Sequence, residues 1–278
     1  MKENYYIFKY LKYTNLKKIK KEFNNNKSIK YAVIDNFIKK KYIVNIANEH
    51  KSIPDESWLA YNHYNQKKMG LSNINLMGKC TKDLINELSS TTFTEWLSDL
   101  SGIKDLISDP SLDGGGLHKI SRGGFLNIHT DFQSHTKYKN WKRKINLLLY
   151  LSPEYKKSWR GELELRDYKD NKIIESISPK FNRCVIFITD SKSYHGHPKP
   201  LNSPKNLARR SLALYYFQVS KKNLPLKPTK YISVDKDDRL KKILIKVDVI
   251  GVYIFSFLKR YSIVNNDTIY KIKKAFKK

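Results

Sequence analysis

Cysteine is scarce in this sequence: Cys80 and Cys184 are the two among 278 residues. Two cysteines exclude a scaffold held by several disulfides and a structural zinc site with four thiolates. Long apolar runs are also missing, because the longest clean one, residues 249–258, is about half of the roughly 20 residues that a membrane-spanning helix needs. The chain opens on Met1 and Lys2 rather than on a charged-then-apolar leader. These absences predict a cytoplasmic protein.

Acidic residues are outnumbered, since 54 Lys and Arg against 26 Asp and Glu give a net charge of +28. An apolar fraction of 40% is nevertheless sufficient for the core of one large domain with appendages. The basic residues are mostly lysine, 45 against 9 arginines, whereas nucleic-acid readers commonly use the planar fork of arginine. The charge therefore indicates the compositional bias of an AT-rich genome, and nucleic acid is not an expected partner.

A β-rich core is predicted for residues 110–220. Short apolar or alternating runs, separated by turns and without a helical pattern, indicate a sandwich, jelly roll or barrel. The runs are 117–121, 125–132, 145–151, 162–166, 172–176, 184–189 and 211–219.

The two flanking parts are interpreted as appendages of this core, which gives an α+β fold class. Residues 1–109 are interpreted as mainly helical, with one strand at 31–37, a helix over 38–50 and a capping box at 92–95 that opens a helix. Residues 221–278 carry 16 Lys or Arg and 5 Asp or Glu. This basic tail is expected to be partly helical, over 246–263.

The strongest chemical signal is the pair His129 and Asp131 at the end of a strand-like run. Residues i and i+2 of a strand face the same side, so the two side chains project together. A third ligand has to come from another strand, and His195 and His197 follow the run at 184–189. Two histidines and one carboxylate leave metal positions open, which is typical of non-haem Fe(II) oxygenases. Zinc is the main alternative, although closed structural zinc sites are usually rich in thiolates.

An arginine pair begins the last strand-like run of the core. Arginine can hold a carboxylate at two points. Strand alternation places Arg209 and Ser211 on one face and Arg210 on the other, and a register slip of one residue would exchange the two arginines.

In this order, the His-x-Asp pair, the distal histidine and the Arg-x-Ser resemble those of the Fe(II)/2-oxoglutarate-dependent dioxygenases, in the branch of the prolyl 4-hydroxylases. The resemblance covers roughly residues 109–219, through segments such as NIHTDF, WRGELEL, YHGHPKPL and RRSLALYYF. It implies a double-stranded β-helix (jelly roll), with Fe(II), 2-oxoglutarate and O₂ as cofactors and ascorbate as reductant. It also implies hydroxylation of an unactivated C–H bond of a protein side chain, an amino acid or a saccharide-like metabolite, with release of succinate and CO₂.

The same resemblance assigns the metal ligands. They would be His129, Asp131 and His195. His195 is preferred over His197 because it matches the first histidine of the family's His-Gly-x-x-Pro turn.

The resemblance also assigns the cosubstrate contacts. Arg209 would hold the far carboxylate of 2-oxoglutarate, with Ser211 beside it. Tyr150 matches a position whose hydroxyl reaches that carboxylate, and Asn146 lies on the same strand face. For Tyr150 and Asn146, ordinary packing is an alternative role.

Other histidines and one branch of the superfamily receive a different interpretation. His118 and His135 are expected in a loop or at a rim, and His50 and His63 at the surface.

Nucleic-acid demethylases of the superfamily carry a second arginine six residues after the first, where this chain has tyrosine, which disfavours that activity.

Two readings outside the enzyme class remain open. The chain could be a non-catalytic jelly-roll binding protein, or a nucleic-acid or membrane-surface binder that acts through its basic tail. Residues 247–258 are expected to pack on the catalytic domain, because their apolar positions are nearly continuous. The alternative is that they lie in an anionic membrane surface as a peripheral contact.

Overall fold

The computed structural model describes residues 9–10, 16–25, 28–233 and 237–261. Five α-helices are described: α1 (Leu16–Asn25), α2 (Lys40–Ser52), α3 (Lys79–Leu88), α4 (Thr91–Ser101) and α5 (Arg239–Arg260). The strands are β1 (Tyr31–Ile34), β2 (Leu59–His63), β3 (Gln66–Leu71), β4 (Leu106–Ser108), β5 (Gly116–Ile120), β6 (Phe125–Thr130), β7 (Trp141–Tyr150), β8 (Leu163–Arg166), β9 (Ile173–Ile177), β10 (Cys184–Ile188), β11 (Tyr194–His197), β12 (Arg209–Val219) and β13 (Lys230–Tyr231).

One antiparallel sheet curls on itself to form the jelly-roll core. The strand order is β1-β10-β7-β12-β5-β3-β6-β11-β8-β9, with β13 beside β6, β2 beside β3 and β4 beside β12. Side chains from both ends of this path meet in one buried cluster: Val185 and Phe187 of β10 pack with Leu163 and Leu165 of β8. Strands so far apart along the sheet can touch only if it is curled, as the expected jelly roll requires.

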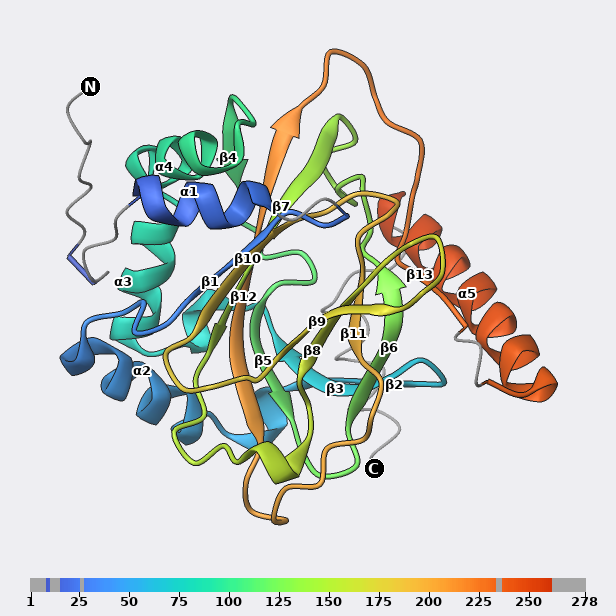
Figure 1. Cartoon of the computed structure of the whole chain (residues 1–278), viewed down its shortest axis with the longest axis horizontal. Helices are drawn as coiled ribbons and strands as arrows, with labels where there is room; N and C mark the ends of the chain where they lie inside the picture. The colour runs from blue at the N-terminus through green and yellow to red at the C-terminus, as the bar shows by residue number, and fades with distance from the viewer. Residues whose placement is uncertain (1–8, 11–15, 26–27, 234–236, 262–278) are drawn as a thin grey trace.

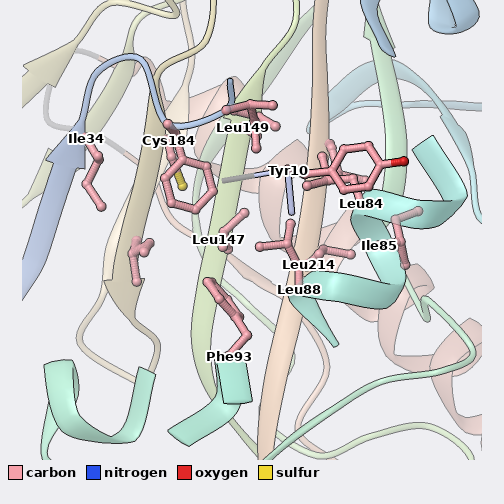
Figure 2. Close-up of a cluster of buried hydrophobic side chains, with 14 of the residues drawn as sticks. Tyr10, Ile34, Leu84, Ile85, Leu88, Phe93, Leu147, Leu149, Cys184 and Leu214 are labelled. Atoms are coloured by element: carbon pink, nitrogen blue, oxygen red, sulfur yellow. The ribbon is translucent and has the colours of Figure 1, made fainter. Parts of the chain in front are cut away.

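The N-terminal helices cover the outer face of the strands at one end of the path. Figure 1 shows α1 to α4 gathered on one side of the sheet and α5 alone on the other. In Figure 2, Leu88 of α3 and Phe93 of α4 lie against Leu147 of β7 and Leu214 of β12, all within the largest buried apolar cluster. The α+β class expected from the sequence is confirmed.

The N-terminal part contributes more strands than its sequence predicts. Only the strand at 31–37 is expected before residue 110, but β2, β3 and β4 also form, and β3 lies in the sheet between β5 and β6. Residues 59–71 are rich in Asn, Gln and Lys, which have weak strand propensity, so their tertiary neighbours decide the conformation. The sheet therefore crosses the boundary placed at residue 110.

Two helix starts also differ from the sequence prediction. Helix α4 is capped by Ser90, whose hydroxyl accepts a hydrogen bond from the Phe93 amide at 3.3 Å, so the capping box at 92–95 is wrong. Helix α5 begins at Arg239 rather than at 246, because the Asp238 carboxylate caps it by accepting from the Lys241 amide at 2.7 Å. The expected end at Ile263 lies outside the described residues. Within the described ranges, we find no helix that combines the length and the apolarity needed to cross a bilayer.

Candidate metal centre

Two neighbouring strands bring the candidate ligands together. β11 pairs with β6 so that His195 lies directly opposite His129. The sequence places His195 after a strand rather than in one, and the structure corrects this: residues 194–197 are themselves a short strand between β6 and β8. A Cβ at Gly196 would lie 2.8 Å from the carbonyl oxygens of Leu126 and Asn127. Glycine at this position therefore allows β11 to lie close to β6.

One oxygen or nitrogen atom from each of His129, Asp131 and His195 lies within 4.8 Å of the others, and all three residues are buried. The Asp131 carboxylate is 3.5 Å from His129 Nε2 and 3.2 Å from His195 Nε2. No other group of three or more His, Cys, Asp or Glu residues in the described part of the chain has such a geometry.

Backbone carbonyl groups orient both imidazole rings. His129 Nδ1 lies 2.8 Å from the Asn127 carbonyl oxygen, and His195 Nδ1 lies 2.8 Å from the Ser193 carbonyl oxygen. Each carbonyl accepts a hydrogen bond from Nδ1–H, which leaves the Nε2 lone pair directed at the centre. Such fixed tautomers are typical of histidines that bind a metal.

The charge of Asp131 is stabilised by groups from β7. Arg143 lies 3.1 Å from the carboxylate, and the Asn146 amide donates a hydrogen bond to it at 2.6 Å. Burial alone would raise the pKa of Asp131, but Arg143 and the two histidines hold it well below its usual value. Burial, together with the neighbouring His195, lowers the pKa of His129. An ionised carboxylate beside a neutral imidazole fits a divalent metal such as Fe(II).

Arg209 lies in the same cavity as these ligands, on β12. The cavity is lined by the three candidate ligands and by Asn146, Ser211 and Arg209. Arg209 donates to the Tyr150 hydroxyl at 3.3 Å and to the Gly161 carbonyl oxygen at 2.9 Å. Arg210 faces away from the cavity and lies 3.6 Å from Glu154, the arrangement that strand alternation predicts.

Asn146 and His197 occupy positions that the sequence could not specify. Asn146 contacts the candidate ligand Asp131 as well as lining the cavity, and its side-chain oxygen accepts from Arg143 at 2.8 Å. His197 lines the cavity too, but it is not part of the three-residue group. Neither ring nitrogen of His197 has a hydrogen-bond partner in the described structure.

Lys68 is a site residue that the sequence analysis misses. It lies on β3 and lines the cavity beside Arg209, and burial lowers its pKa to about 8. No sequence signal could have identified it, because its place depends on the insertion of β3 between β5 and β6.

Two of the other histidines, His118 and His50, lie elsewhere than expected, whereas His135 lies in a loop as expected, although it is buried. His118 is buried on β5 and lines the cavity. His50 is buried rather than exposed, and its Nε2 donates to the His118 carbonyl oxygen at 3.1 Å. His135 is buried 3.3 Å from Asp109, where it supports the loop after β6.

Comparison with known proteins agrees with this geometry. Residues 115–217 match the family model of the 2OG-Fe(II) oxygenase superfamily. A comparison with curated protein sequences finds no match.

Solved structures share the fold at low identity. A prolyl hydroxylase from Trichoplax adhaerens, in complex with a hypoxia inducible factor peptide fragment, is 17% identical over 73% of this chain and 89% of its own, with a TM-score of 0.52. A Pseudomonas putida prolyl-4-hydroxylase is 12% identical over 74% of this chain and 100% of its own, with a TM-score of 0.53. HygX from Streptomyces hygroscopicus, with nickel and 2-oxoglutarate bound, is 10% identical over 77% and 96%, with a TM-score of 0.50.

Proposed function

We propose that this chain, whose residues 115–217 match the family model of the 2OG-Fe(II) oxygenase superfamily, hydroxylates an unactivated C–H bond at the expense of 2-oxoglutarate and O₂. One oxygen atom of O₂ enters the C–H bond as a hydroxyl group, and the other enters succinate as 2-oxoglutarate loses CO₂. The observation that carries the proposal is one cavity that holds His129, Asp131 and His195 together with Arg209.

The roles of the residues follow from their charge and orientation. Bound Fe(II) would supply the redox chemistry that couples O₂ and 2-oxoglutarate to C–H oxidation, and ascorbate would keep the iron in the Fe(II) state without entering the balanced reaction. His129 and His195 offer their Nε2 atoms and Asp131 a negative charge. Arg209 holds the distal carboxylate of 2-oxoglutarate by charge-assisted hydrogen bonds, with Ser211 and the Tyr150 hydroxyl beside it.

Lys68 adds a second cation to this cavity. A dianion such as 2-oxoglutarate gains from two positive groups in a buried site, and Lys68 and Arg209 both line it. We include Lys68 among the residues that hold the cosubstrate.

Succinate formation from 2-oxoglutarate, with Fe(II) and ascorbate present, tests the proposal. The purified protein is screened against fractions of a metabolite and peptide extract, with His129→Ala as the matched inactive control. Turnover that one fraction stimulates, and that the variant lacks, is the expected result. If the protein binds a divalent metal but forms no succinate, either alone or with any of the fractions, the result would favour the non-catalytic jelly-roll binding protein.

A peripheral position at an anionic membrane is a second proposed role, favoured by the outer face of α5. Its apolar residues follow one another at intervals of three and four and are exposed: Leu240, Ile243, Val247, Ile250, Ile254, Phe257 and Tyr261 with the helix's C-cap. We call this set the α5 stripe. The helix carries six Lys or Arg and one acid, Asp248, which is bonded to His63 and Asn65. An exposed apolar stripe flanked by cations suits a surface of anionic lipids.

A further inference from the structure

A groove of about 470 Å³ lies between α5 and the β2–β3 hairpin, and no role has been assigned to it so far. Its walls come from β2, the loop after β6, the segment 226–231 and the inner side of α5. Figure 1 shows α5 beside β6 and β13, across the molecule from α1 to α4. Polar contacts hold the helix there: Asp248 accepts from His63 at 2.8 Å and from Asn65 at 2.6 Å, and Arg260 donates to the Leu224 carbonyl oxygen at 2.6 Å.

The groove adjoins the candidate metal centre. Tyr231 lines the groove, and its ring centroid is 5.6 Å from that of His129. Phe132, which directly follows Asp131, lines it as well, and its ring is 6.1 Å from that of Tyr215, a residue of the metal cavity. Neighbouring aromatic side chains therefore line the groove and the edge of the centre together.

Each charged side chain that lines the groove has a partner of opposite charge, although the Asp113 Oδ2 atom has no hydrogen-bond partner in the described structure. Asp113 forms an ion pair with Lys259, and Asp248 is bonded to His63. The remaining walls expose mainly apolar area, from residues such as Leu59, Tyr61 and Val252, with uncharged polar side chains such as Thr136 and Ser256 between them. Volume and lining match those of sites for small molecules or single side chains. An anionic ligand would find no unpaired cation among the described residues of this lining and would lose its hydration.

We propose that this groove binds the primary substrate, and that it accepts an uncharged, largely apolar group, such as an aliphatic or aromatic side chain. The proposal rests on the hydroxylase function argued above and narrows its substrate class. It favours a protein side chain or an apolar amino acid over a saccharide-like metabolite, because most of the lining is apolar and would leave part of a saccharide's hydroxyl groups without partners. Arg209 and Lys68 serve the anionic cosubstrate in the neighbouring cavity.

Gly251 offers a way to fill the groove without disturbing the fold. It lies on α5 at the groove, and a Cβ built there meets no atom within 4 Å. Replacing a helical glycine also removes an entropic penalty, so Gly251→Phe is expected to fold. Ile250→Phe adds a similar ring on the exposed side of the same helix and is the matched control.

The probe is N-phenyl-1-naphthylamine, a neutral aromatic amine that fluoresces in apolar sites. Wild type and Ile250→Phe should bind it equally, and Gly251→Phe should bind it at least tenfold more weakly. Co(II) in the metal centre should quench the bound probe in wild type and not in His129→Ala, because the groove adjoins the centre. Equal binding by Gly251→Phe, or no quenching by Co(II), would overturn the proposal.

Turnover separates this proposal from the function on which it rests. Gly251→Phe should keep the slow succinate formation that occurs without primary substrate and lose the stimulation by an active fraction. Stimulation that survives in Gly251→Phe would place the substrate elsewhere and leave the hydroxylase function intact. Absence of succinate in wild type would refute the function, while probe binding would still report on the groove.

Discussion

At the scale of single residues, Asp131 is the candidate ligand whose contacts connect the metal centre to the side chains of β7. A buried carboxylate without partners is strongly destabilising, but Asp131 has Arg143 at 3.1 Å and Asn146 at 2.6 Å. The Arg143 guanidinium in turn lies 3.3 Å from the centroid of the Tyr215 ring. These contacts fix the carboxylate in the orientation in which it could bind a metal, which would lower the cost of assembling such a site.

Alanine at any of the three ligands should abolish turnover. The variants His129→Ala, Asp131→Ala and His195→Ala each remove one metal-binding atom, and metal affinity should fall by at least two orders of magnitude, whereas His197→Ala should retain substantial activity. Isothermal titration with Co(II), together with succinate formation, checks both effects. An inactive His197→Ala beside an active His195→Ala would shift the ligand assignment by two residues.

Arg209→Ala should raise the 2-oxoglutarate requirement far more than Arg210→Ala. Arg209 lines the metal cavity, but Arg210 lies beside Glu154 on the opposite strand face. Each hydrogen bond to a charged group is worth roughly 1.5–3 kcal/mol, so the apparent affinity should drop by an order of magnitude or more. Succinate formation against 2-oxoglutarate concentration measures it. Equal effects would show that both arginines serve the cosubstrate.

At the level of elements, the closeness of β11 to β6 decides where His195 lies. Gly196→Ala would place a methyl group 2.8 Å from two backbone oxygens of β6, which cannot move away without disturbing the ladder. We expect β11 to shift and the Co(II) affinity to fall by about tenfold or more. Gly123→Ala is a useful comparison, since a Cβ there meets no atom within 4 Å, although its φ of 77° adds local strain. Its metal affinity should stay unchanged while its stability falls.

The sequence predicts those elements whose pattern is local. The alternating and apolar runs of 110–220 correspond to β5 to β10 and to β12, and the spacing of His129 and Asp131 is enough to place both on one side of a strand. β11 escapes prediction because its four residues, Tyr-His-Gly-His, are short and polar. β2 and β3 escape because their polar residues become strands only through their partners. Lys68 and the groove depend on β2 and β3, so neither could be inferred from the sequence.

For the whole molecule, which carries a net charge of +28, α5 is the element that places positive charges beside an exposed apolar surface. The helix packs on the β2–β3 hairpin through Asp248 and on Asp113 through Lys259. The sequence analysis expects residues 247–258 to pack through their apolar positions, but most of these are exposed and Ile245 is the one buried residue of α5. The opposite side of the helix exposes the α5 stripe beside Arg239 and Lys246. A dimer in which two α5 stripes pack together would bring the cations of both copies close to each other, whereas anionic lipids would neutralise them.

Vesicle co-sedimentation tests whether the α5 stripe binds a surface of anionic lipids. The full chain should bind vesicles that contain phosphatidylserine, and added salt should weaken the binding because part of the attraction is electrostatic. Ile250→Asp and Ile254→Asp put a negative charge in the α5 stripe and should each reduce binding by at least tenfold, about 1.4 kcal/mol. Val44→Asp makes the same kind of change at an exposed position of α2 and should leave binding unaltered. Equal binding by all three variants would refute a membrane role for the stripe. A concentration-dependent dimer that only Ile250→Asp and Ile254→Asp dissolve would assign the stripe to a second copy of this chain.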